Sequence, residues 1–126
     1  MKDGTLLVID VGNTHTVAGL FQGPELLEHW RVTTLPERTS DEFGVLLRDL
    51  FGKQEDLMQG VRAVAVSCVV PPFLPILEEV SLRFFGTRPL VIGPQRQRLV
   101  TVMSSGHPSS DPKLHAQIDS YCGGPQ

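Results

Sequence analysis

Two kinds of apolar pattern alternate along the first part of the chain. Continuous apolar runs, which are typical of strands buried on both faces, occur at residues 6–9, 61–66 and 89–92. Residues 16–21 and 26–34 predict two further strands, because a Gly-Pro turn separates them and residues 26–34 alternate between apolar and polar side chains. We expect residues 6–9 to form the central strand of the sheet.

Helical spacing appears in two other segments. Thr39 and Glu42 have the spacing of a capping box, apolar residues then recur at helical intervals, and Gly52 follows as a stop signal. A second helix is predicted over residues 72–85, with proline at its start and Gly86 at its end. The resulting order, β-β-β-α-β-α-β, predicts an α/β fold: a mixed sheet that opens with an antiparallel meander and has helices packed on it.

A change in composition near residue 94 predicts two parts. Residues 1–94 have the pattern of one folded unit, whereas serine, glycine and proline dominate residues 95–126. Such a segment buries too little apolar surface to offset its ordering entropy. We expect it to be largely disordered or loosely attached, with residues 99–103 as a candidate short strand.

Charge, apolar run length and cysteine spacing exclude several classes of protein. Eleven lysines and arginines against fourteen aspartates and glutamates give a net charge of -3, which disfavours binding to nucleic acid or to anionic membranes. The apolar run at residues 6–9 is too short for a membrane span or a signal peptide. Cys68 and Cys122 lie outside any metal-ligand spacing, so we expect reduced thiols and a cytoplasmic protein.

The residues that carry chemistry gather in one turn, directly after the predicted central strand. The candidate site, with the residues that flank it, is Asp10, Val11, Gly12, Asn13, Thr14, His15, Thr16 and Val17. Glycine lets an anion approach the backbone closely, and backbone amides together with short polar side chains donate hydrogen bonds to phosphate oxygens. Asp10 is placed to hold Mg²⁺ directly or through water. The turn therefore predicts a site for a nucleoside triphosphate.

The same turn also has a purely structural interpretation. Asp10 at a strand end is suited to capping a turn, and Gly12-Asn13 is a common hairpin turn sequence. We expect the ring of His15 to point into solvent rather than to act as a base. Taken alone, the turn leaves both interpretations open.

Five segments in order resemble the type III pantothenate kinase family, within the actin-like superfamily of kinases. They are residues 7–17, 30–31, 38–47, 67–72 and 89–94. The resemblance covers residues 5–94 and implies that residues 1–94 form a ribonuclease H-like, actin-like first domain that binds ATP. It implies transfer of the γ-phosphoryl group of ATP to pantothenate, the first step of coenzyme A biosynthesis. It also implies Mg²⁺, a monovalent cation such as K⁺ or NH₄⁺, and a homodimer in the full-length family.

The resemblance stops after Pro94. In the family a Gly-Ala-Asp-Arg segment follows, which supplies the catalytic base and contacts pantothenate. A second domain then supplies the monovalent-cation ligand and more of the ATP site. Here the stretch around Asp111 leads into Leu114-His115-Ala116-Gln117 instead, so no catalytic residue is assigned.

We therefore expect a truncated or frame-shifted product or a domain fragment, inactive or nearly inactive on its own. Two alternatives remain open at this point. One is an accessory or regulatory relative that binds nucleotide without transferring phosphate, and the other is a dimerisation module.

Overall fold

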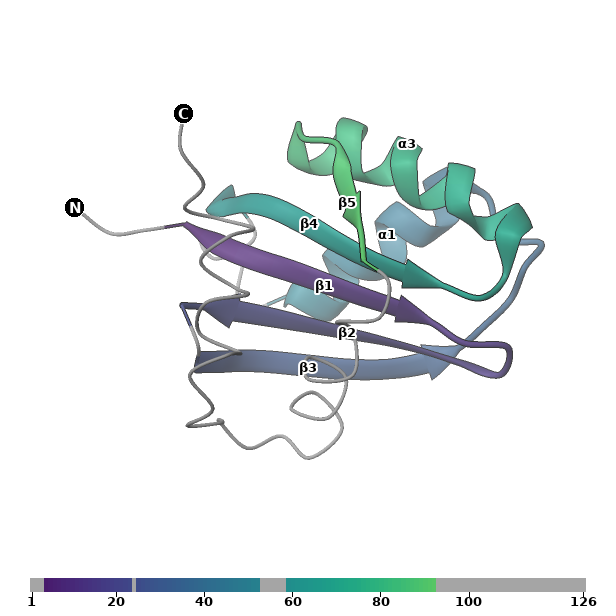
Figure 1. Cartoon of the computed structure of the whole chain (residues 1–126), viewed down its shortest axis with the longest axis horizontal. Coiled ribbons are helices and arrows are strands. Elements are labelled where there is room, and N and C mark those ends of the chain that lie inside the picture. The colour runs from purple at the N-terminus through teal and green to yellow at the C-terminus, as the bar shows by residue number, and fades with distance from the viewer. Residues whose placement is uncertain (1–3, 24, 53–58, 93–126) are drawn as a thin grey trace.

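The computed structural model describes residues 4–23, 25–52 and 59–92, which form a mixed five-stranded sheet with helices on one face (Figure 1). The elements are β1 (Thr5–Val11), β2 (His15–Gln22), β3 (Glu25–Thr33), α1 (Ser40–Phe51), β4 (Val61–Cys68), the 3₁₀ turn η2 (Pro71–Phe73), α3 (Leu74–Phe85) and β5 (Pro89–Val91). The strand order is β3-β2-β1-β4-β5, with β1 antiparallel to β2 and parallel to β4. The predicted element order and the central position of β1 are confirmed.

The start of the second helix differs from the prediction. Residues 71–73 form a 3₁₀ turn, and the α-helix begins only at Leu74. Proline at positions 71 and 72 removes two backbone donors, so Phe73 is the first residue with an amide to give. That amide donates to the carbonyl oxygen of Val70 at 2.8 Å, which is the i to i−3 pattern of a 3₁₀ turn.

The prediction that residues 89–92 form a doubly buried strand is wrong. β5 spans only Pro89–Val91, and it is paired with β4 at one end of the strand order. Leu90 is 42% exposed and Val91 is 62% exposed. An apolar run reports hydrophobicity but not the number of neighbouring strands, so an edge strand and a central strand give the same signal.

The main core lies between the sheet and the two helices. Alternate residues of β1, including Leu7 and Ile9, point to this face and meet apolar side chains of α1 and α3. Aromatic rings join the layers: Trp30 of β3 packs against Phe51 of α1 with ring centroids 5.0 Å apart. This face of the sheet is therefore covered by the amphipathic sides of α1 and α3.

A second apolar cluster occupies the opposite face of the sheet. It contains Leu6 and Val8 of β1, Phe21 of β2 and Ala65 of β4, each at most 1% exposed. The cluster includes no residue of α1 or α3. Both faces of the sheet are therefore apolar, and the described helices cover only one of them.

The predicted capping box fixes the start of α1. The Thr39 hydroxyl accepts a hydrogen bond from the Glu42 amide at 3.1 Å, and the Glu42 carboxylate accepts one from the Thr39 amide at 2.8 Å. At the surface, Arg83 of α3 donates to Asp41 of α1, and this hydrogen bond raises the pKa of Arg83 above its ordinary value. The pair links the two helices at their exposed sides.

The expected loose attachment of residues 95–126, and the candidate strand at residues 99–103, lie outside the described residues. Within the described ranges, none of the helices is both long and apolar enough to cross a membrane.

Gly44 of α1 packs directly against the ring of Phe84 of α3. A Cβ atom at this position would overlap the ring of Phe84. Gly44→Ala gains about 1 kcal/mol of helix propensity, but displacing the ring costs about 1–3 kcal/mol. In the wild-type protein we expect Gly44→Ala to lower the free energy of unfolding by about 1 kcal/mol. In the Phe84→Ala protein we expect the same substitution to raise the free energy of unfolding by about 1 kcal/mol. Urea unfolding of the four proteins in this double-mutant cycle measures both effects, and simple additivity would contradict the packing described here.

Candidate functional site

The β1–β2 turn lies where two parallel strands end together. β1 and β4 run side by side, with Val11 opposite Cys68, and both end at the same edge of the sheet (Figure 1). The amide of Val69, just past β4, donates to the carbonyl oxygen of Val11 at 3.0 Å. The turn is therefore anchored on the β4 side. The carboxyl edge of parallel strands is the usual location of ligand sites in open α/β sheets.

The hairpin itself is closed by Gly12. Its amide donates to the carbonyl oxygen of His15 at 2.9 Å, so this amide serves the turn rather than a ligand. The φ angle of Gly12 is not positive, so the hairpin does not need a left-handed backbone conformation at this position. Space is the constraint instead: a Cβ atom on Gly12 would lie 3.1 Å from the oxygen of His15.

The tip of the turn presents donors to solvent. Asn13, Thr14 and His15 are exposed, and the backbone amides of Asn13 and Thr14 make no hydrogen bond with the described residues. Successive backbone amides in a turn, with amide and hydroxyl side chains beside them, are a set of donors suited to an anion. His15 is exposed, as expected from the sequence.

Thr34 holds this turn in place from the end of β3. Its hydroxyl donates to the carbonyl oxygen of Gly12 at 2.8 Å, and its amide donates to the carbonyl oxygen of Thr14, also at 2.8 Å. A hydroxyl has a single hydrogen, so the contact of 2.8 Å between the two threonine hydroxyls means that Thr16 donates to Thr34. Both residues are buried. The Thr16 hydroxyl, predicted to face phosphate, is therefore used inside the protein.

Sequence reasoning missed Thr34. Thr34 is a single threonine that follows a strand, and nothing in its sequence context marks it as functional. It lies 22 positions after Gly12, and no sequence motif contains both residues. Only the pairing of β3 with β2, in which Thr33 lies opposite His15, brings it beside the turn. A pattern of single residues contains no signal for such a contact.

Asp10 lies half-buried at the end of β1, with Val17 of β2 and Ser67 of β4 as its neighbours across the strands. The alternation of β1 places it on the same face as Val8, away from the helices. In the described ranges, no group of three or more His, Cys, Asp or Glu side chains is gathered for a metal. A single carboxylate fits Mg²⁺, which keeps several waters and is completed by substrate phosphates. It does not fit a metal that needs an all-protein cage.

Two members of the predicted set lie in the core. Val11 is fully buried against the helices, and Val17 is 8% exposed in the second apolar cluster. Their side chains face away from the tip of the turn, so any role at the site falls to their backbone atoms. The remaining candidates are Asp10, at the end of β1, and Gly12, Asn13 and Thr14, in the turn that follows it.

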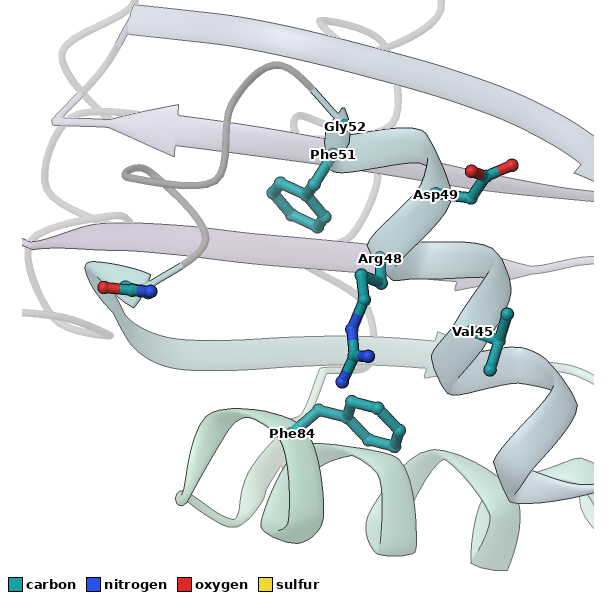
Figure 2. A pocket seen from close by; sticks show the side chains of 7 residues that line it. Val45, Arg48, Asp49, Phe51, Gly52 and Phe84 are labelled. Atoms are coloured by element: carbon teal, nitrogen blue, oxygen red, sulfur yellow. The ribbon is translucent and has the colours of Figure 1, made fainter.

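A separate cavity of about 540 Å³ opens between α1 and α3 (Figure 2). Arg48 reaches from α1 towards Phe84, with its guanidinium 5.6 Å from the ring centroid. The guanidinium is thus already stacked on an aromatic ring, and the cavity contains none of the residues of the β1–β2 turn. We place the candidate site at the turn, where exposed residues with donor groups follow Asp10 in the chain, and not in this cavity.

Solved structures show the fold. RuvC of T. thermophilus, in complex with a Holliday junction substrate, matches with a TM-score of 0.55 at 19% identity, over 94% of this chain and 90% of that one. A ROK family transcriptional regulator matches with a TM-score of 0.50 at 14% identity, over 78% of this chain and 30% of that one. The ribonuclease H-like, actin-like fold is confirmed.

Sequence comparisons identify the family. A family model described as type III pantothenate kinase matches residues 6–110, a range that continues past the motif resemblance ending at Pro94. Type III pantothenate kinases of Myxococcus xanthus and Geobacter sulfurreducens are 55% and 51% identical over 89 residues, which cover 71% of this chain. The chain spans about a third of the length of these curated relatives, 35% in both cases. The chain belongs to the type III pantothenate kinase family.

Proposed function

We propose that the β1–β2 turn binds the β- and γ-phosphates of ATP, and that Asp10 orients the accompanying Mg²⁺. One observation carries the proposal: Asn13 and Thr14 are exposed, their amides make no hydrogen bond with the described residues, and the backbone of their turn is fixed by Thr34 and Val69. Donors that are already held in place bind an anion without a further cost of ordering. The family to which the chain belongs supports ATP as the nucleotide.

The chemistry asked of such a site is mainly positioning and charge neutralisation. In phosphoryl transfer the protein contributes little covalent chemistry, and it aligns the γ-phosphate while stabilising the charge on its oxygens. The amides of Asn13 and Thr14 supply partial positive charge, and their side chains add donors. Asp10 holds the hydrated metal at the edge of the turn. Mg²⁺, when bound, neutralises phosphate charge.

The substrate assignment rests on the family. We propose that the full-length protein phosphorylates pantothenate with ATP, the first step of coenzyme A biosynthesis, in the cytoplasm and as a homodimer. No described residue is assigned as catalytic base or as ligand of a monovalent cation. General-base assistance is worth about 10²–10⁴-fold in rate. We therefore expect this chain alone to bind Mg²⁺-ATP but to transfer phosphate slowly or not at all.

Asp10→Asn tests the role of the carboxylate. Asparagine keeps the size of the side chain and its ability to cap a turn, but it removes the charge that attracts Mg²⁺. We expect wild-type affinity for ATP to rise when Mg²⁺ is added, and this dependence to be lost in the variant. Isothermal titration calorimetry with ATP, in excess Mg²⁺ and in EDTA, measures the difference.

Asp49→Asn is the matched control, because Asp49 is an exposed carboxylate on α1, away from the turn. It should leave both the affinity and its dependence on Mg²⁺ unchanged. Equal affinities for Asp10→Asn and wild type in Mg²⁺ would mean that Asp10 is purely structural. Pantothenate-dependent release of ADP by the purified wild-type chain would show that a base is present after all, and its loss in Asp10→Asn would link that activity to the turn.

Thr34→Val tests whether the turn must be held in shape. Valine has the same shape as threonine but removes the hydroxyl that bonds Gly12 and Thr16, and each lost bond costs about 1 kcal/mol of stability. We expect affinity for Mg²⁺-ATP to fall by about fivefold to tenfold, equivalent to about 1 kcal/mol. Thr33→Val, at the exposed neighbouring position, should bind as wild type does. A loss of stability with unchanged affinity would show that the bonds of Thr34 do not shape the site.

A further inference from the structure

One row of side chains crosses four neighbouring strands on the face of the sheet away from the helices. Asp10 of β1 lies opposite Ser67 of β4 on one side and opposite Val17 of β2 on the other. Val17 lies in turn opposite Arg31 of β3. Residues directly opposite one another in a sheet point to the same face. The row therefore contains, in order, a hydroxyl, a carboxylate, an apolar side chain and a guanidinium.

The direction of Arg31 follows independently from its neighbour in the chain. Trp30 packs on Phe51 of α1 and therefore points to the helices. Successive residues of a strand alternate between the two faces, so Arg31 points away from the helices. Asp10 points to this same face, because it alternates with residues of β1 that pack under α1 and α3. The two charged side chains therefore project from one surface.

Arg31 is exposed, and among the residues that the structure describes it has no ion-pair partner. Two strand intervals separate Arg31 from Asp10, with β2 between β1 and β3 (Figure 1). Paired strands place opposite Cα atoms about 5 Å apart, so the Cα atoms of Arg31 and Asp10 are separated by about 10 Å. The row thus holds a guanidinium and a carboxylate with only Val17 between them.

We infer that Arg31 binds phosphate oxygens of Mg²⁺-ATP while Asp10 holds the metal. The inference rests on the proposed function, since it takes Mg²⁺-ATP as the ligand of the site. A carboxylate attracts the metal and repels phosphate, whereas a guanidinium attracts phosphate and repels the metal. A row with one group of each kind matches a ligand that presents a cation and an anion side by side.

Arginine is suited to this contact by its shape and its charge. Its guanidinium offers parallel N–H donors that bind two oxygens of one phosphate group. The backbone amides of Asn13 and Thr14 are neutral, so they contribute only partial positive charge. In phosphoryl transfer, arginine and Mg²⁺ stabilise the charge on the phosphate oxygens. Arg31 supplies the full positive charge that these amides lack.

The other arginines of the described helices and strands are engaged or distant. Arg83 is paired with an aspartate of α1, and Arg48 is stacked on an aromatic ring in the cavity between α1 and α3. Arg62 lies at the start of β4, whereas the β1–β2 turn lies where β4 ends. Among these arginines, Arg31 is the one that shares a row with Asp10.

Arg31→Gln tests the inference when the full chain is titrated with Mg²⁺-ATP in a calorimeter. Glutamine remains polar but removes the charge and the paired donors, so we expect affinity to fall by about tenfold. Arg31→Lys keeps the charge without the planar fork, and we expect a loss of about threefold. Circular dichroism establishes that both variants keep the sheet, as expected for an exposed position.

Arg62→Gln is the matched control, because it removes the same charge from an exposed position at the far end of β4. It should bind as wild type does. Equal losses in Arg31→Gln and Arg62→Gln would reveal only an effect of net charge and would overturn the inference. Wild-type affinity in Arg31→Gln, with the Mg²⁺ dependence lost in Asp10→Asn, would overturn the role of Arg31 and leave the proposed function intact. No binding of Mg²⁺-ATP by the wild-type chain would overturn both.

The Nε–H signal of Arg31 in ¹H–¹⁵N NMR spectra is a second readout, which a purely structural role would not move. The signal is assigned by its absence from the spectrum of Arg31→Lys. We expect it to shift when Mg²⁺-ATP is added, while the signal of Arg62 stays in place. An Arg31 signal that does not move at saturating nucleotide would mean that the guanidinium does not contact phosphate.

Discussion

The structure depends on the double pairing of β1. This strand is antiparallel to β2 on one side and parallel to β4 on the other, so its carboxyl end is held at the centre of the sheet. The parallel pairing brings Val69 to the backbone of Val11, while the antiparallel hairpin makes the turn at Gly12 short. A turn fixed from both sides projects its tip from a rigid base. Because β1 is buried on both faces, apolar groups must pack against each face. The helices α1 and α3 do so on one of them.

Rigidity of the tip is what the candidate site adds to an ordinary hairpin. A free hairpin turn must be ordered when an anion binds, and that cost is subtracted from the affinity. Here the buried hydroxyls of Thr16 and Thr34 link the turn to the end of β3, and the amide of Thr34 holds the carbonyl oxygen of Thr14. The carbonyl groups of the turn are directed inward to these donors. The amides of Asn13 and Thr14 make no hydrogen bond with the described residues.

Local sequence patterns predict much of the fold. The capping box at Thr39 and the antiparallel meander follow from spacing and turn residues, and the structure confirms both. Local patterns do not show which strands lie next to each other in the sheet. The exposed edge position of β5 and the contact of Thr34 with Gly12 both arise from strand order, which is a property of the whole sheet. The candidate site was found because its residues are contiguous in sequence. Thr34, which holds the turn, was missed because it lies far from the turn in sequence.

The most direct test is a titration of the full chain with Mg²⁺-ATP, followed by backbone amide chemical shifts. If the β1–β2 turn binds the phosphates, the largest changes occur at Asn13 and Thr14, with smaller ones at Val69 and Thr34. Amides around Arg48 and Phe84, which line the cavity between α1 and α3, then stay unchanged. Changes centred on that cavity, or none at Asn13 and Thr14 at saturating nucleotide, would contradict the account.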